Sequence, residues 1–473
     1  MSQIDFDALL RLLSFTPGEP MLFNSGLFLV LFLLFSAGYA LLSAQRAKAV
    51  RLLYVTAFSY YFYYKNAGAW CCLLAVITLV NYFCALRLDH TERPAARKAW
   101  LWLAVGFMLG QLAVFKYTDF AIGTWCDLTG EPRPDTPALP VLVGISFFTF
   151  QSMSYIIDVY RRQMPATRSL TDFAFFVSFF PTLLAGPILR ARTFLPQLAK
   201  PLCVTQQMLG TGTWFIIIGL FKKCVISDYI SVNFVSRIFD NPALYSGLEN
   251  LLGIYGYALQ LYCDFSGYSD MAIGIALWMG FEIPANFRAP YKSDSITDFW
   301  RRWHISLSSW LRDYLYISLG GNRKGRLRMY FNLFLTMLLG GLWHGASWNF
   351  VIWGSVHGFA LGVHKRFREL LGHDRHYQST GIRRFFAVLL TFHLVCFCWL
   401  FFAGTSFEAS MQMIGQICSN FNPQLLPQFL EGYPLVSALM VGGFVLHFLP
   451  TAWNGKAEIL AGRTPLPVQA IAL

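Results

Sequence analysis

Long apolar runs recur along this chain, and they limit what it can fold into more than any other feature. Clear examples span residues 27–42, 70–86, 101–115 and 385–402. A bilayer core has no water to pair with backbone groups, so a chain that crosses it does so as helices or a closed barrel. Charged residues make up only 13% of the sequence, well below the level of soluble domains. The sequence therefore predicts an all-α polytopic membrane protein with roughly ten to twelve transmembrane or re-entrant helices.

The connections between the first runs alternate in charge. Residues 45–51, 87–98 and 161–168 are basic, whereas 119–140 is acidic and rich in proline. Basic connections lie preferentially on the cytoplasmic side of a membrane. We therefore expect the basic connections in the cytoplasm and the N-terminus outside.

We expect a single membrane domain over residues 1–473, with a short N-terminal segment at 1–20 and a basic cytoplasmic or re-entrant segment at 282–328. The net charge is +12, which matches contact with anionic lipid headgroups. No basic domain stands apart from the apolar runs, so nucleic acid is not an expected partner. The ten cysteines form no spaced cluster with histidines, and we expect no metal site.

Three apolar runs carry signs of interruption. Residues 173–188 contain two prolines, which favours a broken or re-entrant helix. Residues 248–279 contain Asp264 and Asp270, which we expect either to accept hydrogen bonds at a helix break or to orient a catalytic imidazole. The run from 329 to 366 is expected to break at Gly340–Gly341 and again near Gly345.

Residues 296–316 read as one amphipathic helix, because apolar side chains recur at three- and four-residue spacing. Ser295 and Asp298 have the spacing of an N-terminal cap. His304 borders the apolar stripe of this predicted helix. An imidazole there is either a satisfied interfacial histidine or a functional group, and the residues alone leave both interpretations open.

His344 follows an apolar approach and is followed at once by Gly345, Ala346 and Ser347. Small residues allow a substrate or a helix to come close. Ionisable groups at membrane depth usually serve a function, and a neutral imidazole can act as a general base near pH 7. His344 is thus a candidate base, with a histidine bonded to a neighbouring helix as the alternative. For His357, packing is the favoured interpretation.

The segment from Glu282 to Arg328 carries nine Lys or Arg against four acids. One interpretation is a cytoplasmic loop on lipid headgroups. The other is a dock for a polyanionic donor such as the phosphates of coenzyme A. For that dock we select Lys292, Arg301, Arg302, Arg323 and Lys324.

Several of these motifs resemble the membrane-bound O-acyltransferase family, in particular its bacterial branch for O-acetylation of alginate, peptidoglycan and similar polysaccharides. The motifs are WRRWHISLS at 300–308, LRDYLYI at 311–317, GLWHGA at 341–346, PVLVGISFFTFQSMSYIIDVYR at 140–161, and the stretches 180–188, 219–223 and 257–270. They occur in order between about residues 21 and 357.

The resemblance implies helices around a central catalytic passage. His344 matches the family's catalytic histidine and His304 its second histidine. The implied donor is cytoplasmic acetyl-CoA, with no metal. The implied acceptor is an extracytoplasmic polysaccharide, reached through a periplasmic SGNH-type acyltransferase, and the implied location is the bacterial inner membrane.

Two alternatives stay open at this point. The same fold could move another acyl group, such as D-alanyl from a carrier protein. The basic segment and the broken helices could instead belong to a polyanion transporter whose histidines relay protons.

Overall fold

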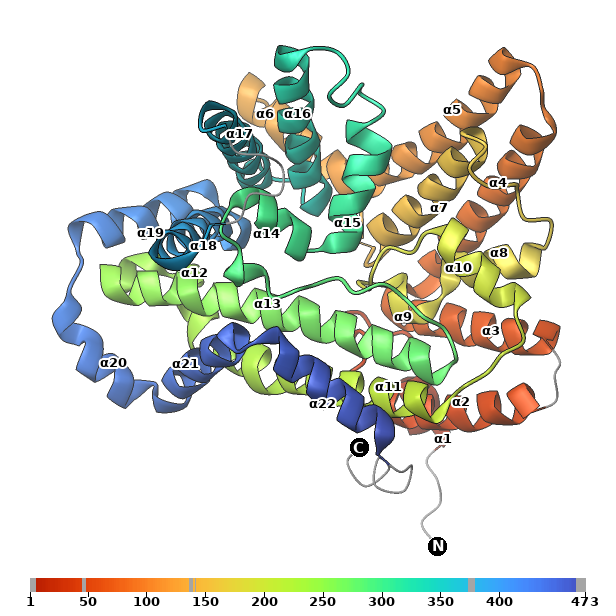
Figure 1. Ribbon diagram of the computed structural model, residues 1–473, viewed down its shortest axis with the longest axis horizontal. Helices are drawn as coiled ribbons and strands as arrows, with labels where there is room; N and C mark the ends of the chain where they lie inside the picture. The colour runs from red at the N-terminus through yellow and green to blue at the C-terminus, as the bar shows by residue number, and fades with distance from the viewer. Residues whose placement is uncertain (1–5, 45–47, 136–138, 141, 373–378, 465–473) are drawn as a thin grey trace, which may run out of the picture. The chain divides into compact units, whose positions relative to one another are not determined.

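The structure is a computed structural model that describes residues 6–44, 48–135, 139–140, 142–372 and 379–464. Over these residues every regular element is a helix, which confirms the predicted all-α class (Figure 1). Part of the basic connection at 45–51 lies outside the described residues. In the part of the chain that the structure describes, three helical stretches are long and apolar enough to cross a membrane: Lys48–His90, Pro94–Thr129 and Gly381–Ala403. A fourth results if Pro423–Gly432 and Pro434–Phe448, bent by 104°, count as one span. The larger expected number of spans stays a prediction.

The chain forms two compact units, which we describe separately. The first comprises the residues up to Thr213 together with Met271–Pro284, and the second comprises Trp214–Asp270 with Ala285–Thr464. The prediction of one domain over the whole chain stays a prediction. The helices of the first unit are α1 (Phe6–Leu13), α2 (Gly26–Ala44), α3 (Lys48–Ala67), α4 (Cys71–His90), α5 (Pro94–Leu112), α6 (Thr118–Thr129), α7 (Ile145–Tyr160), α8 (Leu170–Ser178), α9 (Phe180–Leu183) and α10 (Ala191–Ala199).

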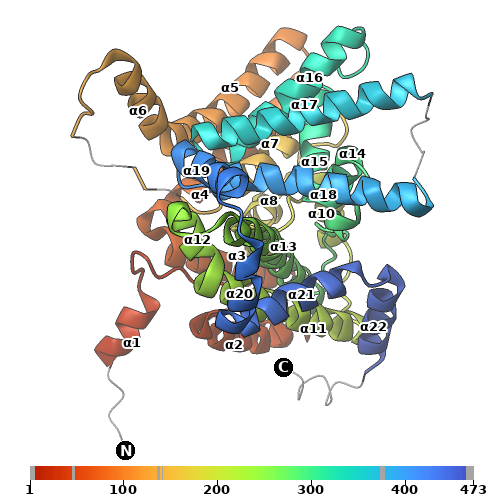
Figure 2. The same ribbon diagram turned by 90° about the vertical axis from the view of Figure 1, so that its left-hand side faces the viewer.

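Two helices, α11 (Gln206–Leu220) and α13 (Gly247–Trp278), contribute residues to both units. The helices that belong to the second unit alone are α12 (Ser236–Asp240), α14 (Ile296–Arg302), α15 (Ile305–Trp310), α16 (Arg326–His344), α17 (Trp348–Leu370), α18 (Gly381–Ala403), α19 (Phe407–Ser419), α20 (Leu426–Gly432), α21 (Pro434–Phe448) and α22 (Thr451–Arg463). Figure 2 shows the same elements turned by 90°.

The predicted break in residues 173–188 is confirmed. The α8 helix ends at Ser178 and the short α9 begins at Phe180, with Pro181 in its first turn. Proline lacks an N–H and cannot continue the preceding helix, but it fits the start of a new one. The Phe180 ring packs within 5.5 Å of the rings of Phe35 and Phe58, so the break is anchored in the aromatic core of the first unit.

The predicted interruption of residues 248–279 is wrong, because α13 is continuous over 32 residues. The carboxylates of Asp264 and Asp270 do not bond to backbone groups at a helix break; each forms an ion pair with a lysine. Lys222 lies 2.7 Å from Asp270, and Lys223 lies 2.6 Å from Asp264. Both lysines belong to the π-helical segment η3 (Phe221–Asp228). A buried charge needs a partner, and here the partner comes from another element, so the helix itself need not open.

The α16 and α17 helices form a hairpin, and they lie side by side in Figures 1 and 2. The predicted break at Gly340–Gly341 is wrong, since α16 runs through both glycines to His344. Those glycines serve helix packing: a Cβ on Gly341 would lie 3.0 Å from Cα of Gly354 on α17. The predicted break near Gly345 is confirmed, because residues 345–347 separate the two helices.

The prediction of one amphipathic helix over 296–316 is also wrong. The cap is confirmed, since Ser295 Oγ accepts from the Asp298 amide at 3.3 Å. The helix then stops after Arg302, and His304 takes the left-handed backbone conformation with φ 42° and ψ 57°. A neighbouring extended stretch supplies the missing backbone bonds. The Arg288 amide donates to the Arg302 carbonyl at 3.0 Å, and the Ile305 amide donates to the Asn286 carbonyl at 2.9 Å.

Candidate active site

His304 lies in the junction between α14 and α15, and its side chain is almost fully buried, at 1% exposure. Its Nδ1 lies 3.2 Å from Oδ1 of Asn286. The ring of Phe265, on α13, meets the imidazole edge-on at a centroid distance of 4.7 Å. A side chain with a fixed backbone, a hydrogen bond and a ring contact has little freedom to move, so His304 is held in one orientation.

His344 is the last residue of α16 and is half-buried. Its imidazole lies 5.1 Å from the ring centroids of both Trp353 and Phe402, which come from α17 and α18. The next residue must be small, because a Cβ at position 345 would overlap the ring of Phe350. Gly345 thus lets the chain turn out of α16 directly beside the imidazole.

The structure brings His304 and His344 to one residue, Trp343. The Trp343 ring centroid lies 6.0 Å from that of His304 and 4.8 Å from that of His344. The two imidazoles are 40 positions apart in the sequence, yet both contact the same indole. This shared neighbour is the feature that makes the pair a candidate active site.

His357 belongs to a different environment and supports the packing interpretation. It is fully buried, with an exposure of 0%, and its Nδ1 accepts from Nε1 of Trp300 at 3.3 Å. The rings of Trp353 and Trp399 complete its aromatic surroundings, at centroid distances of 4.6 and 6.5 Å. Its Nε2 has no hydrogen-bond partner among the residues that the structure describes.

A cavity of roughly 670 Å³ lies in the second unit, lined by residues of α14, α15, the π-helical segment η7 (Leu311–Tyr316), α16 and α17. Its apolar lining residues include Trp300 and Leu311. Among the described residues, the cationic side chains that line it are Arg301, Arg312, Arg326, Lys365 and Arg368, and one carboxylate, Glu369, lines it as well. We call it the basic cavity. Apolar side chains together with several cations suit a ligand that combines phosphates with a less polar group.

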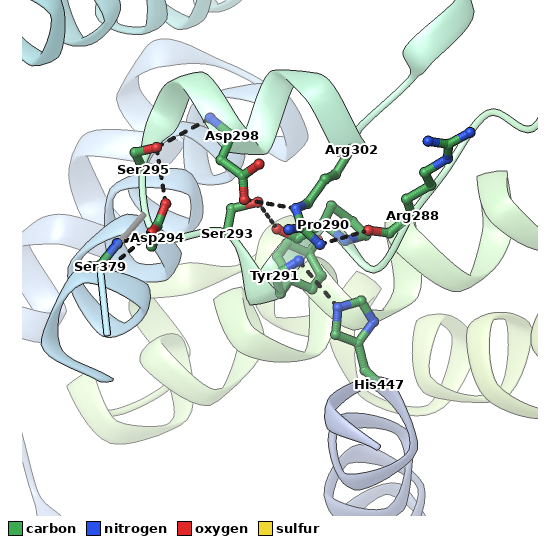
Figure 3. A network of polar contacts seen from close by, with 10 residues as sticks. All are labelled: Arg288, Pro290, Tyr291, Ser293, Asp294, Ser295, Asp298, Arg302, Ser379 and His447. Carbon is green, nitrogen blue, oxygen red and sulfur yellow. Dashed lines mark hydrogen bonds and ion pairs between the residues drawn. The ribbon is translucent and has the colours of Figure 1, made fainter. Parts of the chain in front are cut away.

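Only one of the five residues selected from sequence as a donor dock, Arg301, lines the basic cavity. Arg302 is engaged elsewhere: its Nε lies 2.7 Å from Asp298, and it donates to the Arg288 carbonyl at 3.4 Å (Figure 3). Lys292 donates to the Leu449 carbonyl at 2.5 Å. Burial and the neighbouring Arg302 and Arg384 lower the pKa of Lys292. The binding roles selected for all five stay predictions.

Arg323 and Lys324 are exposed and do not belong to the residues that line the basic cavity. The sequence-based choice of donor-binding residues missed four cations that line the cavity. Arg312 and Arg326 lie within the basic segment at 282–328, and Lys365 and Arg368 lie beyond its end. A helical projection of residues 361–369 would have placed Lys365 and Arg368 on one face.

Asp294 fastens the start of α14 to the residue that follows the undescribed stretch 373–378. The Ser379 hydroxyl and amide donate to its Oδ2 at 2.7 and 3.2 Å (Figure 3). Burial raises the pKa of Asp294, but the bonds from Ser379 and Ser295 outweigh it, so the pKa lies below its usual value. This fixes the helix that carries Arg301.

The fold and the candidate site suit a membrane-embedded transferase, and comparison with known proteins defines the class. Residues 23–402 match the model of the MBOAT, membrane-bound O-acyltransferase, family. The chain belongs to this family and is an O-acyltransferase of the multi-pass membrane class.

Individual relatives are similar over most of the chain. It is 42% identical to the probable alginate O-acetylase AlgI of Pseudomonas putida, over 94% of this chain and 90% of the relative. It is 36% identical to the peptidoglycan O-acetyltransferase of Helicobacter pylori, over 83% and 79% of the two chains. It is 33% identical to the teichoic acid D-alanyltransferase of Bacillus subtilis, over 59% of this chain and 73% of the relative.

Proposed function

We propose that this chain takes acetyl groups from cytoplasmic acetyl-CoA and passes them across the bacterial inner membrane for O-acetylation of an extracytoplasmic polysaccharide such as alginate or peptidoglycan. The observation that carries the proposal is the similarity to O-acetyl-transferring relatives over nearly the whole chain. The D-alanyltransferase relative matches a smaller share, which favours acetyl over D-alanyl.

His344 is the general base in this proposal. A hydroxyl is a weak nucleophile until a base takes its proton. His344 accepts that proton while the hydroxyl oxygen bonds to the thioester carbonyl carbon. The carbon–sulfur bond then breaks, and the imidazolium returns the proton to the leaving thiolate. The products are an acetyl ester and free coenzyme A, and His344 ends in its starting state.

In this proposal His304 supports the same reaction as His344. Both imidazoles contact that indole, at 6.0 and 4.8 Å between ring centroids, so both belong to one aromatic-walled site. An environment poor in water strengthens each hydrogen bond to a developing charge.

The basic cavity is the donor site. Coenzyme A carries several phosphates, and arginine forks recognise phosphate oxygens with paired hydrogen bonds. Arg301, Arg312 and Arg368 come from three different elements and line one space, which is the arrangement a branched polyanion requires. We place this cavity on the cytoplasmic side, as the basic segment at 282–328 predicts.

The acceptor side needs a partner. Acetyl-CoA is bulky and charged, so only the small acetyl group crosses an apolar core at low cost. The acidic segment at 119–140 is too short to bind a polysaccharide chain. A periplasmic SGNH-type acyltransferase is therefore the proposed carrier between this chain and the sugar.

The test supplies radiolabelled acetyl-CoA to the cytoplasmic face of sealed inside-out vesicles that contain the chain. We expect slow release of coenzyme A from the chain alone, and labelled polymer only in vesicles whose lumen, the periplasmic side, contains both the polymer and the periplasmic acyltransferase. Label in the polymer without the partner would refute the relay. Transfer from a D-alanyl carrier but not from acetyl-CoA would refute the proposed donor.

The His344→Ala variant tests the base. We expect a folded protein whose acetyl transfer falls at least about 1,000-fold, since both proton steps lose their carrier. His90→Ala is the matched control, because His90 is an exposed histidine at the end of α4. Equal activity in both variants would refute the role of His344, and donor-independent polyanion transport by His344→Ala would favour a transporter.

A further inference from the structure

Asn286 lies at the centre of the His304 junction. It sits in the extended stretch between α13 and α14, and its side chain is buried, at 1% exposure. Its side-chain oxygen faces three groups of the junction: His304 Nδ1 at 3.2 Å, the Ser306 amide at 3.2 Å and the Ser306 hydroxyl at 2.9 Å. Its side-chain nitrogen donates to Ser269 Oγ at 3.3 Å.

These contacts determine which ring nitrogen of His304 carries the proton. A backbone N–H can only donate, so the Asn286 atom that faces the Ser306 amide must be the oxygen. That same oxygen faces Nδ1 of His304, and an oxygen of a carboxamide can only accept. Nδ1 is therefore the N–H of the neutral ring, and Nε2 keeps its lone pair.

The backbone around His304 reinforces this arrangement. His304 is one of three residues other than glycine with positive φ among those described, and its φ of 42° is unfavourable for a side chain with a Cβ. Ile305 directly follows His304, and its amide donates to the Asn286 carbonyl at 2.9 Å. Main chain and side chain of Asn286 thus hold both the turn and the imidazole.

We propose that Asn286 is a positioning residue that keeps His304 as the Nδ1–H tautomer and so presents Nε2 as the acceptor atom of the active site. This inference rests on the proposed function, in which His304 supports acyl transfer. Asn286 itself acts through the imidazole and not on the substrate.

Asn286→Asp is the informative variant, because aspartate keeps an acceptor oxygen for all three donors and adds a negative charge. That charge favours the imidazolium, so His304 loses its acceptor form at a higher pH than in the wild type. We expect the pKa of the His304 ring, followed through its ¹⁵N signals, to be higher in the variant than in the wild type by roughly one unit. An unmoved pKa would overturn the proposal.

The other titratable groups near His304 are the same in the wild type and in Asn286→Asp. Phe265 neighbours Asp264, which is paired with Lys223, and Asp270 on the same helix is paired with Lys222. Trp343 neighbours His344 on α16. The difference between the variant and wild-type pKa of His304 therefore reports the charge added at position 286.

Two further variants separate positioning from simple stability. Asn286→Leu preserves the size but not the acceptor, and we expect kcat to fall at least about tenfold at an unchanged KM for acetyl-CoA. Ser269→Ala removes only the partner of the Asn286 nitrogen, and we expect near-normal kcat. A loss in Ser269→Ala equal to that in Asn286→Leu would point to a packing role and overturn the proposal.

The tautomer also has a direct spectroscopic readout. In the wild-type chain labelled with ¹⁵N at histidine rings, the His304 signals are assigned by their loss in His304→Ala. We expect a protonated Nδ1 and a bare Nε2 at neutral pH, and the reverse pattern would overturn the inference without reference to activity. Absence of any acetyl transfer by the wild type would instead refute the proposed function.

Discussion

Two regions of the second unit differ in how their charged side chains are arranged. Around α13, each cation faces a carboxylate: Lys222 pairs with Asp270, and Lys223 pairs with both Asp264 and Asp228. Among the described residues, five cations and one carboxylate line the basic cavity, and of these cations Arg312 also pairs with Asp313 at 2.8 Å, so the cations stay in excess. Paired charges satisfy one another and serve the fold, whereas an excess of one sign raises the local potential and suits an oppositely charged ligand. The comparison predicts that changes around α13 act on stability and changes in the cavity act on donor binding.

The largest expected effect follows from removing one member of the Lys222–Asp270 pair. Asp270→Ala leaves a partly buried ammonium without its carboxylate, and we expect a loss of about 3 kcal/mol in the free energy of unfolding. The measurement is thermal unfolding of the detergent-solubilised protein. The double variant Lys222→Met/Asp270→Leu should recover most of the loss, and a double variant no more stable than the single one would contradict the pairing.

A second test compares two adjacent arginines on α14. Arg301→Gln removes a cation from the basic cavity, so we expect the KM for acetyl-CoA to rise about tenfold with unchanged thermal stability. Arg302→Gln breaks the partly buried pair with Asp298 and the bond to the Arg288 carbonyl, so we expect an unchanged KM and a loss of about 1 kcal/mol in the free energy of unfolding. The measurements are the KM for acetyl-CoA and the melting temperature of each variant. Equal effects on KM would contradict the prediction that Arg301 but not Arg302 contacts the donor.

Removing one phosphate from the donor should have a smaller effect. Acetyl-dephospho-CoA loses the 3′-phosphate, and we expect its KM to be a few-fold higher than that of acetyl-CoA. In Arg368→Gln the two donors should become more alike, and in the wild type added salt should weaken both. A donor preference that is independent of Arg368 would place the 3′-phosphate elsewhere.

The smallest expected effect concerns the tie between Asp294 and Ser379. The pKa of Asp294 is lowered in the folded protein, so its contribution is complete above the unfolded pKa, near 4, and is lost as pH falls through the folded pKa. Ser379→Ala should reduce stability by less than about 1 kcal/mol at pH 7. Melting curves from pH 7 down through the acid range test this, because the wild type and the variant should converge as Asp294 becomes protonated in the folded protein.

Local patterns in the sequence predicted much of the helical structure. The Ser295 cap, the proline break before α9 and the apolar helices α18 and α21 follow from the periodicity, the capping chemistry and the hydrophobicity of neighbouring residues. The sequence also singled out His304, at the border of an apolar stripe, and His344, which follows an apolar run and precedes three small residues. Membrane character and fold class were determined at this level.

Only the tertiary structure decided how those residues are used. The positive φ at His304 depends on Asn286, 18 positions away, and the basic cavity needs α17, some 60 positions from Arg301. Asp264 and Asp270 suggested a broken helix by themselves, but lysines of η3 pair with them and α13 stays whole. Local preferences are weak compared with the free energy of an unpaired charge or polar group in the interior, so the partners available across the fold determine the outcome.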